Sequence, residues 1–126
     1  MKFHHIGIAT KDLKSSLEFV QKNFEVLEVS EEIFDENQNA TLQMIKTKDL
    51  NIELVSGKVV EKLIASKITY YHICYEVEDI YGKIEEFKKN GGAMLVSSVK
   101  PAILFDNRLV AFLMTPLGLV ELLNAN

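Results

Sequence analysis

An internal repeat constrains what this chain can fold into more than any other feature of its sequence. Three short segments recur in the same order, the first two after 67 residues and the third after 68. The matching segments are His5-Ile6 and His72-Ile73, Asp12-Leu13 and Asp79-Ile80, and Ile52-Glu53-Leu54-Val55 and Val120-Glu121-Leu122-Leu123. One of the matches contains histidine, which occurs only three times in the chain. Three matches in one order favour a duplication over chance.

Each half of the repeat has the pattern of a β-α-β-β-β module. Period-two and β-branched segments predict strands, at residues 2–9, 25–34, 40–46, 51–55, 70–77, 93–99, 108–114 and 118–123. Asp12 and Asp79 each precede a helical stripe and can cap its first turn. The second helix should end at Asn90-Gly91-Gly92, because glycine enters the left-handed region without penalty. One more helical turn is expected within 59–63.

The apolar stripes of the two helices predict which side chains pack against the sheet. In the first helix, over residues 12–23, the apolar residues recur at spacings of three and four. We expect burial against the sheet for Leu17 and Val20 in the first module, and for Ile84 and Phe87 in the second. The chain is therefore expected to be one α+β domain over residues 1–126, with modules at about 1–56 and 68–126.

Composition restricts the classes of partner. The 126 residues carry 14 basic and 18 acidic side chains and one cysteine, Cys74. A net charge of −4 without basic runs argues against nucleic acid as a partner. A single cysteine excludes an internal disulfide framework. With no apolar run of about 18 residues and no signal-peptide pattern at its start, we expect a soluble cytoplasmic protein with no membrane partner.

Four polar residues stand at equivalent places in the two halves: His5 and Glu53, then His72 and Glu121. Alternate side chains of a strand share a face. His5 should therefore lie beside Gly7 and Ala9, and His72 beside Cys74, which leaves room next to each imidazole. Two such modules related by pseudo-symmetry can direct all four side chains into one concave space.

Two carboxylates in one partly dry site repel each other, and a bound cation is one remedy. Imidazole nitrogens and carboxylate oxygens suit a divalent transition metal, namely Ni, Co, Mn, Fe or Zn, and suit magnesium poorly. Taken one at a time, each residue has an ordinary alternative. A strand histidine is commonly hydrogen-bonded to backbone, and a strand glutamate commonly points to solvent. The symmetric set favours the metal.

The same segments resemble the vicinal oxygen chelate superfamily, which includes glyoxalases and bleomycin-resistance proteins. The resemblance spans nearly the whole chain, in HHIGIATKDL, IELV, YHICYEVEDI and RLVAFLMTPLGLVELL. It implies the glyoxalase fold, in which two βαβββ modules form a curved, cup-like mixed sheet. It also implies metal ligands on the first and last strand of each module, which are His5, Glu53, His72 and Glu121 here. Pairing into a homodimer is implied as well.

Within the superfamily the chain is most similar to methylmalonyl-CoA epimerases, in its His-Ile-x-Ile-Ala opening and its middle strand. That similarity implies metal-dependent proton transfer next to a carbonyl group of a small molecule, such as an acyl-CoA. Glu121 would be both ligand and base. Gln43 lies near where some epimerases place a second acid/base, although an amide cannot take a proton; alternatively, Gln43 is a solvent-facing strand residue. The segment KPAILFDNR, residues 100–108, departs from the glycine-rich loop of epimerases, and Tyr71 stands where they often have a second histidine.

Two other functional classes remain open. Bacterial glyoxalase I carries the same four ligands, but it tends to have an arginine in the first strand and an asparagine after the Glu-Leu strand. Neither is visible here, so glutathione chemistry ranks second. A non-catalytic small-molecule binder is the third alternative, and such members generally lack the ligands. An extradiol dioxygenase is disfavoured because Glu53 would fill a position that oxygen needs.

Two further residues are candidates for substrate contact. Cys74 shares a face with His72, and we interpret it as a small lining residue rather than a reactive thiol. Arg108 closes a turn at Asp106-Asn107; alternatively, its guanidinium clamps a substrate carboxylate or phosphate.

Overall fold

The computed structural model describes all residues, Met1–Asn126, and contains ten strands, three α-helices and two short 3-10 turns. The chain forms two compact units. The N-terminal unit is His5–Tyr71, and the C-terminal unit is His72–Asn126 together with Met1–His4. None of the three helices is both long enough and apolar enough to cross a membrane.

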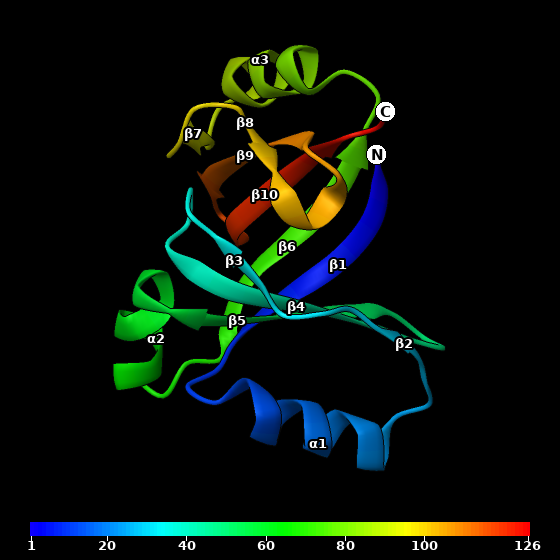
Figure 1. Ribbon diagram of the computed structural model, residues 1–126. Coiled ribbons are helices and arrows are strands. Elements are labelled where there is room, and N and C mark those ends of the chain that lie inside the picture. The colour runs from blue at the N-terminus through cyan, green and yellow to red at the C-terminus, as the bar shows by residue number, and fades with distance from the viewer. The chain divides into compact units, whose positions relative to one another are not determined.

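The N-terminal unit combines a mixed sheet with a helix that packs on one face of it (Figure 1). Its elements are the part of β1 (Lys2–Ala9) from His5 onward, α1 (Leu13–Asn23), β2 (Val26–Val29), β3 (Ile33–Asp35), β4 (Ala40–Thr47), β5 (Asn51–Gly57), a 3-10 turn (Lys58–Val60) and α2 (Glu61–Ala65). The strand order is β2-β4-β5-β1, and β3 also pairs with β4. Strands β1 and β5 are parallel, whereas the other pairs are antiparallel.

Helix α1 begins and packs as its sequence predicts. The Asp12 carboxylate accepts a hydrogen bond from the Lys14 backbone N–H at 3.2 Å, which satisfies one free donor of the first turn. Val20 is buried in a cluster with Ile45 and Leu54 of the sheet, and Leu17 is half-buried against the same cluster. The burial predicted for Val20 is therefore confirmed and that of Leu17 is only partial, and Phe24, which continues the same apolar stripe, lies beyond the helix and is exposed.

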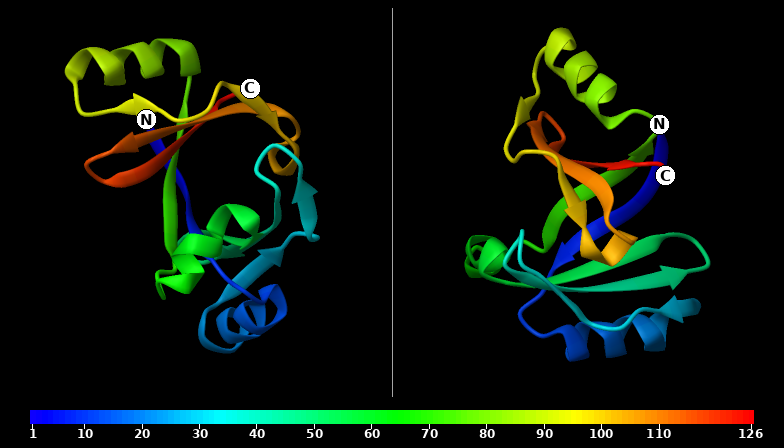
Figure 2. Two further views of the ribbon diagram at one scale, coloured as in Figure 1. Left: turned by 90° about the vertical axis from the view of Figure 1, so that its left-hand side faces the viewer. Right: turned by 45° about the horizontal axis from the view of Figure 1, so that its top comes forward.

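The C-terminal unit repeats this plan, with a helix against one face of a mixed sheet (Figure 2). Its elements are the part of β6 (Tyr70–Val77) from His72 onward, α3 (Ile80–Asn90), β7 (Met94–Leu95), β8 (Lys100–Ala102), a 3-10 turn (Ile103–Phe105), β9 (Arg108–Thr115) and β10 (Gly118–Asn124). The strand order is β6-β10-β9-β7, and β8 pairs with β9. Strands β6 and β10 are parallel, as β1 and β5 are in the other unit.

Helix α3 also has the ends that its sequence predicts. The Asp79 carboxylate accepts a hydrogen bond from the Gly82 backbone N–H at 3.1 Å. The helix ends before Gly91, whose φ of 84° is rare for residues that carry a side chain. Ile84 is buried in a cluster with Leu122, and Phe87 packs half-buried against it. The α+β class and the order of strands and helices predicted for both modules are thus confirmed.

Two predicted strands are wrong in their extent, for the same reason. The segment predicted as one strand over 25–34 is two strands, β2 and β3. Between the pairs Val29–Ile45 and Ile33–Leu42 the outer strand advances by four residues and β4 by three. In the segment predicted over 93–99, only Met94–Leu95 is a strand, and the ladder resumes five residues later opposite Val110. Extra residues on an edge strand interrupt its pairing.

Candidate functional site

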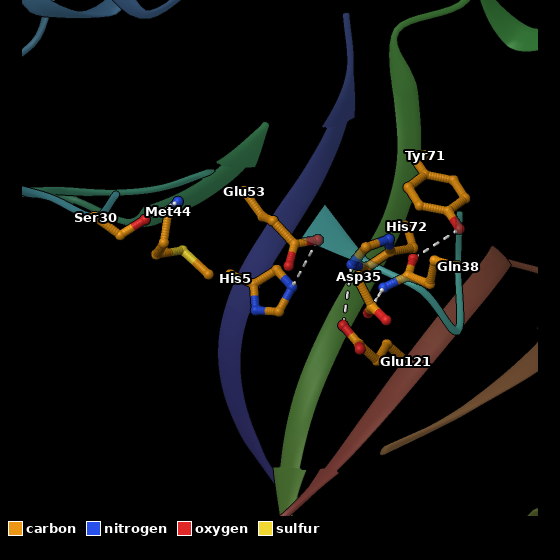
Figure 3. Close-up of polar contacts among 9 residues, drawn as sticks. All are labelled: His5, Ser30, Asp35, Gln38, Met44, Glu53, Tyr71, His72 and Glu121. Atoms are coloured by element: carbon orange, nitrogen blue, oxygen red, sulfur yellow. Dashed lines mark hydrogen bonds and ion pairs between the residues drawn. The ribbon is translucent and has the colours of Figure 1, made fainter. Parts of the chain in front are cut away.

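In the N-terminal unit, a buried histidine and a buried glutamate come from the parallel strands β1 and β5. Gly7 lies opposite Glu53 in the ladder, and His5, two residues before Gly7, shares its face. His5 Nε2 lies 3.7 Å from Glu53 Oε1, and a dashed line marks this contact in Figure 3. Both side chains are at most 1% exposed.

The C-terminal unit has the same arrangement on β6 and β10. Cys74 lies opposite Glu121 in the ladder, and His72 shares the face of Cys74. His72 Nε2 lies 3.1 Å from Glu121 Oε1 (Figure 3), and both side chains are at most 2% exposed. The alternative in which the strand glutamates point to solvent is therefore wrong for both Glu53 and Glu121.

The donor set of each pair fits a divalent transition metal. Each pair offers one imidazole nitrogen and one carboxylate oxygen, the ligand types that such ions accept. Two ligand atoms about 2.1 Å from one ion, at an angle of about 90–110°, lie about 3.0–3.4 Å apart. The observed separations of 3.1 and 3.7 Å are close to that range. A carboxylate this deeply buried also requires positive charge or donors nearby, which an ion supplies.

An apolar residue lies opposite each glutamate on the neighbouring strand, and its place in the site was not predicted. Met44 lies opposite Glu53, and Phe112 lies opposite Glu121. The Phe112 ring packs edge-on to His72, with ring centroids 5.4 Å apart. The offset of 68 that relates the two glutamates also relates Met44 to Phe112. Extending the repeat by that offset would have identified both residues.

Gln43 does not lie beside Glu53, contrary to the expectation of a second acid/base there. In the antiparallel ladder Gln43 lies opposite Leu54, so it occupies the face that α1 covers, and Glu53 occupies the other. Its amide donates a hydrogen bond to the Ser30 carbonyl at 3.1 Å. The alternative of a solvent-facing residue is also wrong, because Gln43 is only 8% exposed. Its observed contact is structural.

Arg108 is the first residue of β9 rather than part of the preceding turn. Its guanidinium forms an ion pair with Glu76, and its Nε donates to the Asn124 carbonyl at 2.9 Å. The hydrogen bond from Arg108 holds the pKa of the Glu76 carboxyl below its usual range. The guanidinium thus already has an internal carboxylate partner, which leaves its expected role as a substrate clamp without structural support.

Cys74 lies on the same face of the sheet as Glu121, as its strand position predicts. It is fully buried, in a cluster with Ala102, Val110 and Leu123. Full burial is typical of a structural cysteine rather than a reactive thiol.

A polar network in the N-terminal unit was not predicted. The Tyr71 hydroxyl donates to the side-chain oxygen Oε1 of Gln38 at 3.2 Å, and the side-chain amide nitrogen of Gln38 donates to the Asp35 carboxylate at 3.0 Å (Figure 3). Asp35 is only 4% exposed and also accepts from the Asn37 backbone N–H. The network connects the turn after β3 to the residue that precedes His72.

The sequence matches the model of one family. The Glyoxalase/Bleomycin resistance protein/Dioxygenase superfamily matches residues 4–112. A comparison with curated proteins finds no match.

Solved structures share the fold over almost the whole chain. Methylmalonyl-CoA epimerase from Mycobacterium tuberculosis has a TM-score of 0.84 at 18% identity, covering 99% of this chain and 88% of that one. A hypothetical protein from Bacillus halodurans C-125 has a TM-score of 0.77 at 25% identity, covering 99% and 94%. A glyoxalase/bleomycin resistance protein/dioxygenase superfamily member from Vibrio splendidus 12B01 has 0.53 at 14%, covering 94% and 95%. The predicted glyoxalase fold is therefore confirmed.

Proposed function

Because the chain belongs to the glyoxalase/bleomycin resistance protein/dioxygenase superfamily, we propose that it is a metal-dependent enzyme that moves a proton at a carbon next to a carbonyl group. The superfamily's name includes both enzymes and resistance proteins, so membership alone leaves catalysis and simple binding open. The observation that supports an enzyme is the buried histidine–glutamate pair that stands at equivalent positions of both units.

In this proposal His5, Glu53, His72 and Glu121 bind one divalent ion, which is Ni, Co, Mn, Fe or Zn. The support is chemical, because each pair combines an imidazole and a carboxylate that are shielded from water. Nitrogen and oxygen donors without a thiolate are typical of such ions. A bound ion would also compensate the charge of two carboxylates that burial otherwise penalises.

The chain's own residues divide the work of the reaction. A divalent ion bound there would supply positive charge that stabilises the negative charge developing on the substrate's carbonyl oxygen. Glu121 accepts the proton from the adjacent carbon and returns it. His72 and Glu121 would be neighbouring ligands of the ion, with His72 Nε2 and Glu121 Oε1 3.1 Å apart. Glu53 serves only as a ligand. Because all four side chains are buried, bulk water does not reach the proton while it is on Glu121.

The proposed substrate class is a 2-substituted acyl thioester, such as an acyl-CoA. The epimerase from Mycobacterium tuberculosis acts, by its name, on methylmalonyl-CoA, and it shares this fold. Gln43 has no part in the proposed chemistry, since it lies on the other face of the sheet from Glu53. We further propose that the chain works as a homodimer, which light scattering coupled to gel filtration would test.

The metal is tested first, with protein purified without chelator and analysed by inductively coupled plasma mass spectrometry. We expect about one divalent ion per chain, and loss of the ion in His5→Ala and His72→Ala. His4→Ala is the matched control, because His4 is adjacent in sequence and its ring packs on Phe105. Protein that carries no metal and binds none on addition would refute the proposal and favour the non-catalytic binder.

The reaction is tested with the metal-loaded protein in deuterium oxide. We expect methylmalonyl-CoA to exchange its α-hydrogen for deuterium, as followed by mass spectrometry. The hemithioacetal of methylglyoxal and glutathione is assayed alongside it, as the substrate of glyoxalase I. Turnover of the second substrate alone would contradict the epimerase assignment in favour of a lyase. If neither substrate reacts with Ni, Co, Mn or Zn bound to the protein, both the epimerase and the lyase assignments are refuted.

A further inference from the structure

The N-terminal unit contains a cavity that the proposed function does not use. Its volume is about 660 Å³, within the usual range for small-molecule sites. It lies between α1, the end of β1 and the segment after α2. The β5 residues Ile52 and Leu54 line it, and they alternate with Glu53 along the strand. The cavity is therefore on the opposite face of the sheet from Glu53.

The walls of this cavity are mostly apolar. The sheet contributes Ile8, Ile52 and Leu54, α1 contributes Phe19 and Val20, and the segment from α2 onward contributes Ile64 and Ile68. Phe19 is 61% exposed and Ile68 is 47% exposed, so apolar surface at this cavity is in contact with water. A ligand with an aliphatic body would remove this apolar surface from water.

The charges that line the cavity have one sign. Lys11 and Lys67 are its only charged lining residues, both are exposed, and neither forms an ion pair with an acidic side chain. The chain as a whole has an excess of acidic residues, 18 against 14 basic. The polar lining includes Thr10, which is only 8% exposed and whose hydroxyl lies 2.7 Å from that of Ser16. An anionic head group next to an aliphatic body complements this distribution.

The backbone of Lys67 is in a conformation that a lysine rarely adopts. Its φ is 59°, and its N–H donates to the Ile64 carbonyl at 3.0 Å where α2 ends. Glycine or asparagine is the usual residue at such a helix end, because a side chain is strained there. Lys67 nevertheless occupies this position and is one of the residues that line the cavity.

From these observations we infer that the cavity binds a medium-chain aliphatic carboxylate. The alkyl chain lies on the apolar walls, and the carboxylate lies between the Lys11 and Lys67 ammonium groups. The volume equals that of about 20 water molecules, enough for the 12 non-hydrogen atoms of decanoate. A nucleotide or coenzyme A is a poorer match, since two lysines are few for several phosphates. The inference does not rest on the proposed metal chemistry.

Titration of decanoate into the full-length protein tests the inference, by calorimetry and by ¹H–¹⁵N NMR below the concentration at which decanoate forms micelles. We expect saturable binding, with shift changes at the amides of Thr10, Ser16, Ile64 and Thr69. We expect 1-decanol, which has the same chain without the charge, to bind about tenfold more weakly. No binding, equal affinity for decanol, or shift changes confined to the C-terminal unit would each overturn the inference.

Charge variants identify the site. Lys11→Gln/Lys67→Gln should weaken decanoate binding about tenfold and leave decanol unchanged. Lys22→Gln/Lys58→Gln is the matched control, because it removes the same charge from the same unit at residues that do not line the cavity. Lys67→Gly removes the strained side chain, so the melting temperature should hold or rise while decanoate affinity falls. Affinity unchanged in the first variant, or reduced equally in the control, would overturn the inference. Metal content is measured in every variant, so that failure here is distinguishable from failure of the proposed function.

Discussion

Substituting Glu121 by glutamine, with Glu53→Gln as its partner experiment, distinguishes the proposed base from a residue that only binds metal. Both glutamates are buried, at 1% and 2% exposed, and both have a histidine nitrogen within 4 Å. Each substitution preserves side-chain size and one carbonyl oxygen, and each removes one negative charge. The two variants therefore perturb packing and metal affinity to similar extents, and they differ in whether the base is lost.

The expected difference follows from those roles. Loss of a general base lowers the rate by a factor of about 10²–10⁴, or about 3–5 kcal/mol of activation free energy. In Glu121→Gln, the rate at which methylmalonyl-CoA takes up deuterium from solvent should fall by that factor, measured at metal concentrations that saturate the variant. Glu53→Gln should lose much less, since its proposed task is ligation. Thermal unfolding and metal analysis of both variants control for damage to the fold or the site.

One result would refute the reasoning outright. Equal losses of exchange in Glu53→Gln and Glu121→Gln, with metal bound in both, would mean that the two glutamates do not differ in any role that matters for catalysis. A larger loss of exchange rate in Glu53→Gln than in Glu121→Gln would indicate that Glu53, on β5, is the base.

Three further predictions concern stability. Arg108→Met should cost about 0.5–1 kcal/mol of unfolding free energy at pH 7, because the Glu76–Arg108 pair is partly exposed. The pKa of Glu76 is lowered in the folded protein, so this contribution is present above the unfolded pKa and is lost as pH falls through the folded one. Urea unfolding should therefore show the difference between wild type and variant shrinking as the pH falls below the ordinary range of a glutamate carboxyl. Leu122→Ala should cost about 3–5 kcal/mol because Leu122 is fully buried, whereas Leu117→Ala, 70% exposed, should be nearly neutral by the same assay. Chelator should lower the melting temperature of metal-loaded protein, since about 2.7 kcal/mol is lost when an ion at 100 times its Kd is removed; an unchanged melting temperature would contradict a bound ion.

Much of the fold was predictable because its signals are local or repeated. Asp12 and Asp79 mark the start of a helix because their carboxylates accept hydrogen bonds from backbone N–H groups of its first turn. Gly91 marks the end of a helix because glycine adopts a positive φ without strain. The 67- and 68-residue offsets made the second module predictable from the first. Strand ends at the sheet edges were not predictable, since an extra residue in a bulge leaves no clear mark on the hydrophobic pattern.

The candidate site was predictable to the extent that it depends on position within one strand. Alternation placed His72 on the face of Cys74, and the ladder agrees. The prediction for Gln43 was wrong because the position of Gln43 relative to Glu53 depends on the register between β4 and β5. A shift of one residue in that register exchanges the two faces of the strand. The ion pair of Arg108 was not predicted for a related reason, because its partner Glu76 lies 32 residues away in sequence.

The sequence alone thus determined the duplicated βαβββ order, the helix ends and the four histidine and glutamate candidates, because each depends on neighbouring residues or on the repeat itself. Only the tertiary structure decided which strands pair in which register. Register places Met44, rather than Gln43, opposite Glu53, and it places Phe112 opposite Glu121. The packing of the strands also brings Arg108 to Glu76. It also decided that α1 and the segment after α2 leave a cavity with Lys67 at its edge. Cavities and ion pairs depend on distances between segments remote in sequence, which periodicity within a single segment does not specify.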